Sequence, residues 1–238
     1  MRPAAVVALA IAATVLFAAG LAQAKKKAAE LFWTRPDYAT LHVDRIAMLP
    51  VTSYDNDLAN ENLVEATLGP AFRTTGYRWI SGSSTREMLR ARTGGDSLLK
   101  VLRAGVLAQG RLDSLQAPAL AALLRCDAVL TVRVDLMERH EPEWNVAGKP
   151  YTDVRLSAAL VDSAGRLLWI ATGGQAGEGA YYDPAANPVG VSNSGLDRKP
   201  MSGQGGAPQF REVLPTLFAR WAPEFPPHAA APDSSARQ

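Results

Sequence analysis

The sequence predicts an α/β (α+β) domain, with a mixed parallel and antiparallel sheet of about five strands and helices packed on its faces. Three observations lead to this fold class. An apolar strand, an amphipathic helix and a second strand follow one another over residues 45–81, an order that favours parallel pairing. An alternating strand pattern covers residues 128–136. The stretch LVDSAGRLLW, residues 160–169, then predicts an antiparallel hairpin.

The first strand is RIAMLPV, residues 45–51, a short apolar run that ends at a proline. The following helix, residues 61–75, places its apolar side chains on one face: Leu63, Val64, Leu68, Ala71 and Phe72. Pro70 lies inside this pattern and predicts a kink or a split, because proline lacks an amide donor and crowds the preceding turn. Residues 77–81, YRWIS, form the second strand.

Three further helices lead to the third strand, and the first is a short one that Ser84 or Thr85 can cap. Gly94 and Gly95 precede a helix over about residues 97–107, and Pro118 falls in the first turn of the next helix, where its missing N–H costs least. Residues 128–136, AVLTVRVDL, alternate and are rich in valine and leucine, which is typical of a strand.

The hairpin supplies the fourth and fifth strands. Residues 154–160 alternate between apolar and polar or small side chains, the period of a strand with one buried face. Asp162 to Gly165 are turn-forming residues. Trp169, just after the turn, is expected to be buried against the helices, because a tryptophan there contributes a large apolar area.

The last third of the chain predicts a flexible loop, a helix and a tail. Residues 173–208 are rich in Gly, Ser, Asn and Pro and lack an apolar period, which indicates a functional or disordered loop. Tyr181 and Tyr182 are the candidate partner-binding residues of this loop, since tyrosine is enriched at interfaces. The equally weighted alternative is that both rings fold back onto the sheet. Apolar side chains from Phe210 to Trp221 recur at helical spacing, with a bend expected at Pro215.

The domain boundaries follow from these patterns. Residues 1–24 read as a signal peptide, with a positive start, an apolar run and the small-x-small site Ala22-Gln23-Ala24. The alternative is an uncleaved membrane anchor, because three lysines follow the run directly. Residues 25–44 are an exposed lead-in, residues 45–222 a single domain, and residues 223–238 a disordered tail.

The sequence presents no recognisable catalytic, cofactor or metal site. The 238-residue chain carries a net charge of only +2, which does not favour a nucleic-acid partner. It contains neither a phosphate-binding loop nor a nucleophile-elbow motif. His140 lies among Glu138, Glu141 and Glu143, but adjacent side chains on an extended segment point to alternate faces, so a solvated strand end is favoured over a cation site. Cys126, the single cysteine, is expected to be a small buried hydrophobe.

The order of these motifs resembles a superfamily of bacterial envelope proteins. It includes the curli-secretion lipoprotein, the penicillin-binding-protein activator LpoB, the amino-terminal domain of TolB and related lipoproteins of unknown function. The resemblance covers about residues 45–176 and rests on Leu49-Pro50, Gly76-Tyr77, Cys126-Asp127-Ala128 and the hairpin through Trp169. It implies an anticodon-binding-domain-like fold in a non-enzymatic domain that works through protein contacts.

The sequence departs from these relatives in two ways. Cys126 stands where the relatives carry a small Gly or Ala, and no cysteine lies near the cleavage site to carry a lipid. The expected function is therefore that of a periplasmic accessory or assembly protein, with an envelope protein as partner and an oligomer possible. The alternatives are a secreted hydrolase with a dispersed site and a membrane-anchored, sensor-like module.

Overall fold

The computed structural model describes residues 30–142, 146–183 and 206–228, and the predicted signal peptide lies outside them. The strands are β1 (Leu31–Thr34), β2 (Arg45–Met48), β3 (Thr52–Ser53), β4 (Arg78–Ile80), β5 (Ala128–His140), β6 (Tyr151–Asp162) and β7 (Leu167–Glu178). The helices are α2 (Leu58–Arg73), α3 (Gly82–Arg90), α4 (Gly95–Gln109), α5 (Ala117–Leu124) and α6 (Phe210–Trp221), with short 3-10 turns η1 (Tyr38–Thr40) and η2 (Ala222–Glu224).

These strands form one mixed sheet in the order β1-β7-β6-β5-β2-β4, with β3 paired to β5. β2 runs parallel to β4 and β5, because α2 and the later helices carry the chain back between them. β5, β6 and β7 form an antiparallel meander, and β1 adds antiparallel to β7. The predicted fold class is confirmed, although the described sheet has seven strands rather than five.

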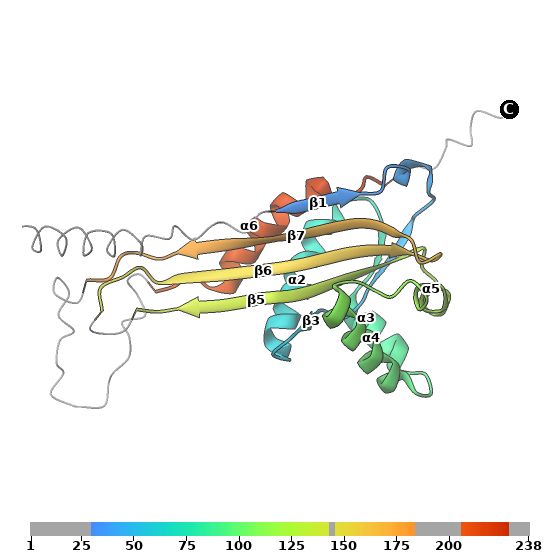
Figure 1. The fold of residues 1–238 in the computed structure, drawn as a ribbon, viewed down its shortest axis with the longest axis horizontal. Helices are drawn as coiled ribbons and strands as arrows, with labels where there is room; N and C mark the ends of the chain where they lie inside the picture. Colours follow the sequence, from blue (N-terminus) through green and yellow to red (C-terminus); the bar gives the residue numbers. More distant parts are fainter. Residues whose placement is uncertain (1–29, 143–145, 184–205, 229–238) are drawn as a thin grey trace, which may run out of the picture.

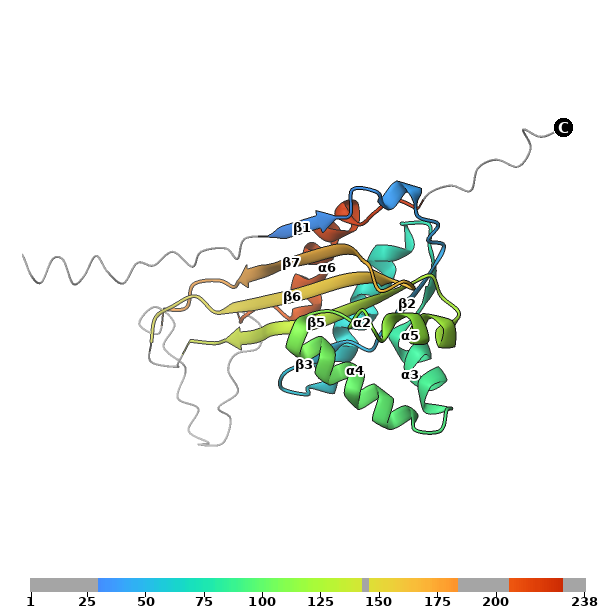
Figure 2. The same cartoon turned by 45° about the vertical axis from the view of Figure 1, so that its right-hand side comes forward.

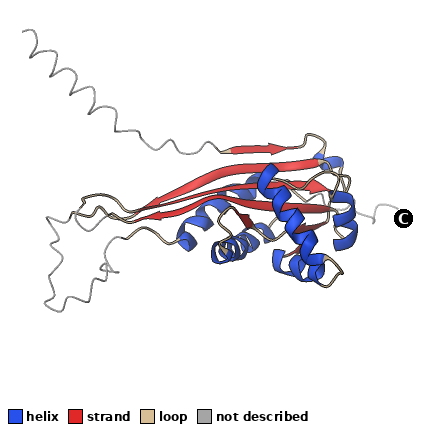
Figure 3. Cartoon of the chain, turned by 60° about the horizontal axis from the view of Figure 1, so that its bottom comes forward, coloured by secondary structure: helices blue, strands red, loops and turns tan. Residues whose placement is uncertain are grey.

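Helices cover both faces of the sheet and create two cores (Figures 1 and 2). One core packs α2 and α6 against the sheet, and the other packs α3, α4 and α5 against the opposite face of β2 and β5. Figure 3 shows that the helices gather toward one end of the three long strands, which continue beyond them. The long meander is therefore packed at one end and projects at the other.

Trp169 lies in the middle of the first core, as predicted. Its side chain is fully buried and meets the rings of Phe72, Trp221 and Phe225 at centroid distances of 6.3, 6.4 and 4.9 Å. Its Nε1–H donates to the carbonyl of Glu224 at 2.8 Å. Strand β7 thus supplies the aromatic side chain around which α2, α6 and the η2 segment assemble.

The predicted exposed lead-in, residues 25–44, contains an edge strand and a buried tyrosine. β1 pairs with β7, with Leu31 opposite Thr172. Tyr38 is only 5% exposed, and its hydroxyl lies 2.7 Å from that of Tyr77. The sequence did not predict this four-residue strand. Its Leu31 is exposed, so apolar side chains do not alternate with polar ones as they do in a strand with one buried face.

The predicted loop at 173–208 begins later than expected, because β7 continues through Glu178. Gly173, Gly174 and Gly177 lie within this strand, and each faces close neighbours that leave little room for a side chain. A Cβ at Gly177 would come within 3.0 Å of Val213 and 3.2 Å of Pro208, so glycine permits α6 and the segment before it to approach the strand.

The predicted disordered tail, residues 223–238, is also wrong for its first part. Phe225 is 4% exposed, and the Tyr77 hydroxyl donates to the Pro226 carbonyl at 3.0 Å. An aromatic residue and a buried acceptor therefore hold this segment on the core. Residues 229–238 lie outside the described part of the chain.

Both prolines that were expected to interrupt helices lie inside continuous ones. α2 runs through Pro70 and α6 runs through Pro215. Asp57 caps the start of α2, because its side chain accepts from the backbone N–H groups of Ala59 and Asn60. Tertiary packing of α2 against α6 and the sheet compensates for the hydrogen bond that each proline removes.

Candidate interaction surface

The projecting end of β5, β6 and β7 is a three-stranded arm. Along β5 the side chains change from buried, between Ala128 and Val132, to exposed, between Glu138 and His140. Figure 1 shows these strands continuing past α2 and α6. Because the meander hydrogen bonds extend to the pair His140–Tyr151 and to the pair Tyr151–Glu178, the arm keeps its sheet geometry without a helix on it.

Tyr181 and Tyr182, the candidate partner-binding residues, lie at the tip of this arm. The backbone of Tyr182 pairs with Gly148 through two hydrogen bonds of 2.8 and 3.0 Å. The Tyr181 side chain is 60% exposed, whereas that of Tyr182 is half-buried. The two side chains therefore differ in exposure, and the fold-back alternative stays a prediction for both. A partner-binding role for either residue stays a prediction.

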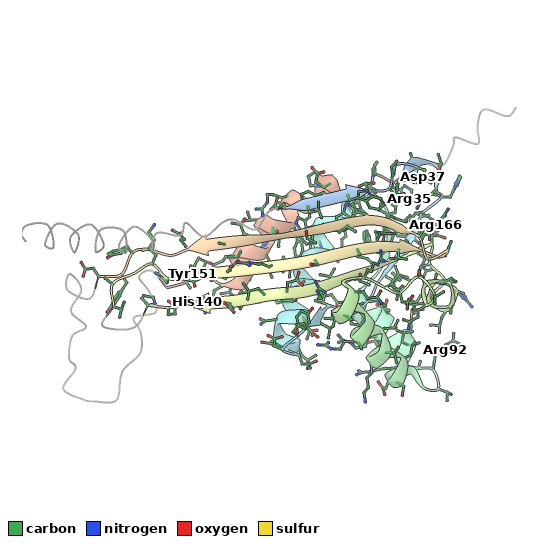
Figure 4. The ribbon with its side chains drawn as sticks, in the orientation of Figure 1. Arg35, Asp37, Arg92, His140, Tyr151 and Arg166 are labelled. Carbon is green, nitrogen blue, oxygen red and sulfur yellow. The ribbon has the colours of Figure 1, made fainter. Side chains whose placement is uncertain are left out.

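Further groups make the arm tip chemically mixed. Val146 is 48% exposed, and Lys149 pairs with Glu178 at 3.0 Å. The rings of His140 and Tyr151 stack from neighbouring strands at 4.4 Å (Figure 4). Exposed aromatic and apolar area beside scattered charges is typical of a protein interface rather than of a catalytic pocket.

Both described ends of the segment between Asp183 and Gly206 lie at this arm. Asp183 follows the Tyr182 bridge, and the backbone N–H of Ala207 donates to Glu141 at 3.1 Å. Arg139 donates to the Ala207 carbonyl at 2.8 Å. Residues 184–205, which hold most of the predicted loop, lie outside the described residues.

The predicted solvated strand end around His140 is confirmed in part. His140 Nε2 lies 2.9 Å from Glu138, and both side chains are about half exposed. Glu143 lies outside the described residues. Across residues 30–142, 146–183 and 206–228, no three His, Cys, Asp or Glu side chains gather as metal ligands.

A buried polar cluster that the sequence did not reveal joins β3, α2 and α4. Glu61, 1% exposed, accepts from the N–H and hydroxyl of Ser53 at 2.9 and 2.8 Å and from Arg103 at 2.7 Å. Arg103 also donates to the Ser53 carbonyl at 2.7 Å. Because Ser53 is itself only 1% exposed, its hydroxyl is presented to Glu61 and not to a substrate. These hydrogen bonds tie β3, α2 and α4 together, and we call the cluster of Ser53, Glu61 and Arg103 the latch.

Cys126 is a buried free cysteine, as expected. It is 8% exposed, at the turn between α5 and β5. Burial raises the pKa of its thiol to about 11, so the thiol stays protonated at neutral pH and is a poor nucleophile.

No helix within the described ranges is both long and apolar enough to cross a bilayer. The predicted apolar run at the amino terminus is not among these ranges.

Comparison with known proteins finds likeness only among solved structures. No protein-family model matches the sequence, and no curated protein matches it. The lipoprotein GNA1162 from Neisseria meningitidis is similar at 20% identity and a TM-score of 0.42, over 64% of this chain and 89% of that chain. The PelC dodecamer from Paraburkholderia phytofirmans gives 15% identity and a TM-score of 0.43, over 82% and 97%. The hypothetical protein CT253 from Chlamydia trachomatis gives 12% identity and a TM-score of 0.38, over 76% and 97%.

Proposed function

We propose that the chain is a non-enzymatic accessory protein of the bacterial envelope, exported to the periplasm, whose projecting arm binds another envelope protein. The observation that carries the proposal is the arm itself. Its strands extend beyond the helical layers, and the segments that follow β7 and precede β6 carry the exposed side chains of Tyr181 and Val146. A sheet that leaves its own core presents a rigid surface for another molecule at little entropic cost.

The sequence supports the compartment and the class of partner. The signal-peptide pattern favours export, and the motif order resembles envelope proteins that work through protein contacts. The polar groups of the Ser53–Glu61–Arg103 latch satisfy one another and leave no open nucleophile–base pair there. This arrangement favours a binding role over the hydrolase alternative.

The test compares two exposed apolar positions at opposite ends of the molecule. Tyr181→Ala changes the arm tip, and Leu115→Ala changes an 86% exposed leucine between α4 and α5. Each tagged variant is expressed in the native host, and the proteins that co-purify from its envelope are quantified. Tyr181→Ala is expected to lose at least tenfold of the main partner, because a tyrosine anchor contributes roughly 2 kcal/mol or more. Leu115→Ala is expected to keep it.

Thermal unfolding of both variants separates an interface from a packing effect. Equal midpoints with selective loss of the partner would support the arm as the interface. Equal partner recovery by both variants would contradict the proposal, as would a loss of partner that follows a lowered midpoint in Tyr181→Ala.

A further inference from the structure

A groove lies between α2 and β4, on the side of the molecule where the sheet ends. Its cavity has a volume of about 460 Å³. The floor is apolar and is formed by Met48, Leu68, Phe72 and Trp79. The walls are one face of α2 and, opposite it, β4 with the segment that joins it to α3. This size falls in the range of ligand pockets, and no part of the function proposed above uses it.

The α2 wall offers an acceptor and open space. Pro70 has no amide hydrogen, so the carbonyl of Ala66 cannot receive the usual hydrogen bond from position 70. Gly69 lies between them in sequence and also lines the cavity, and a Cβ added there would meet nothing within 4 Å. A helix face with a freed carbonyl and no covering side chain can be approached closely by another chain.

The β4 wall offers donors and an open strand edge. β4 is the last strand of the described sheet. The N–H of Arg78 donates inward to the carbonyl of Asp44 at 2.9 Å. Because consecutive residues of a strand alternate in hydrogen-bond direction, the backbone N–H and C=O of Trp79 point to the open edge. The Trp79 Nε1–H is also buried and has no hydrogen-bond partner among the described residues.

The rim of the groove carries an available positive charge. Arg73 is exposed, and none of the ion pairs among the described residues includes it. The acidic residue of the lining, Glu65, is already engaged, since it accepts from the N–H of Ser83 at 2.6 Å at the start of α3. The groove therefore complements a ligand that carries a carboxylate near Arg73.

We infer that this groove binds an extended, acidic segment of a partner protein, which adds as a further strand alongside β4. The segment places one large apolar side chain against Phe72 and Trp79 and a carboxylate at Arg73. An extended backbone supplies an acceptor for the outward backbone N–H of Trp79 and a donor for the carbonyl of Ala66, which is the chemistry of strand addition. The inference deepens the proposed function and rests on it, by assigning a second contact with an envelope protein.

The chain's own end is a poorer occupant of the groove. The described part ends at His228, whose ring meets that of Tyr77 at 5.0 Å, just before β4. Residues 229–238 are AAAPDSSARQ and contain no apolar side chain larger than proline. They cannot supply the anchor that an apolar floor of this size accommodates.

The test uses fluorescent ten-residue peptides selected from a random display library on the purified chain. Gly69→Phe fills the groove, and Gly69→Ala is the matched control, since the Cβ has room. Selected peptides are expected to carry an aromatic or branched side chain near Asp or Glu. Their affinity is expected to fall at least tenfold in Gly69→Phe and less than twofold in Gly69→Ala. Arg73→Gln is expected to weaken binding about two- to fivefold, the size of an exposed ion pair.

The second readout is the indole N–H resonance of Trp79 in a ¹H–¹⁵N spectrum, assigned with Trp79→Phe. It is expected to shift when the peptide binds and to stay unchanged when residues 229–238 are deleted. Failure to select a peptide, or equal binding by both Gly69 variants, would overturn the inference. So would a shift on deletion of the tail, which would make the tail the occupant. Any of these results, with partner loss in Tyr181→Ala intact, would leave the proposed function standing.

Discussion

Replacement of Trp169 by alanine tests the packing that supports the whole meander. A fully buried tryptophan removes about 150–250 Å² from water, worth roughly 4–6 kcal/mol at ~25 cal/mol per Å². Partial collapse of the surrounding rings reduces this loss, so Trp169→Ala is expected to destabilise the protein by about 3–5 kcal/mol. The same change removes the indole donor of the 2.8 Å hydrogen bond to the carbonyl of Glu224, a loss of roughly 1 kcal/mol that falls within this range.

The assay is urea unfolding followed by far-ultraviolet circular dichroism, with thermal melting as a second measure. A chain of this size loses about 2–4 °C in Tm for each kcal/mol, so a fall of roughly 6–20 °C is expected. Trp33→Ala, at a position 40% exposed on β1, is the matched control and is expected to cost under about 1 kcal/mol. A loss below about 1 kcal/mol in Trp169→Ala would refute the assigned core.

Three further outcomes follow from the structure. Glu61→Gln is expected to lower the free energy of unfolding by roughly 1–3 kcal/mol, because it removes the charge that holds Ser53 and Arg103. A urea unfolding curve equal to that of the wild type would show that the latch is dispensable. The pKa of the Cys126 thiol is raised to about 11, so the protonated thiol favours the fold, and stability is expected to be full below about pH 9 and to fall as the pH rises toward 11. Cys126→Ala is expected to flatten this alkaline decline in urea titrations, and an unchanged pH profile would assign it to other groups. Amino-terminal sequencing of the exported protein is expected to begin at Lys25, and an intact apolar run in the membrane fraction would favour the anchor instead.

Much of the fold could be predicted because its periodicities are local. The hairpin around Gly165 and the burial of Trp169 follow from alternation and a turn, and both are confirmed. The extension of β7 could not be read, because glycine in a strand looks like a loop until α6 is placed against it. β1 could not be predicted either. It is an edge strand whose Leu31 is exposed, so its sequence shows no alternation of buried and exposed side chains.

Of the candidate sites, one could be predicted from local sequence and two could not. Tyr181 could be singled out because paired aromatic residues stand out in a polar segment, and its exposure keeps that prediction open. The latch of Ser53, Glu61 and Arg103 joins residues up to 50 positions apart, and no local pattern connects them. The groove beside β4 exists because β4 is the edge strand of the sheet. The order of the strands in the sheet cannot be predicted from local sequence patterns.

The central claim is that the arm tip contacts another envelope protein. The most direct measurement is site-specific photo-crosslinking in living cells of the native host, with a photoreactive phenylalanine analogue at position 181 and, as a control, at position 115. Both side chains are exposed, at 60% and 86%, so the probe is accessible at both sites and the control position is the more exposed one. We expect a discrete, ultraviolet-dependent adduct with one envelope protein from position 181 and none from position 115. No adduct from position 181, or the same adducts from both positions, would contradict it.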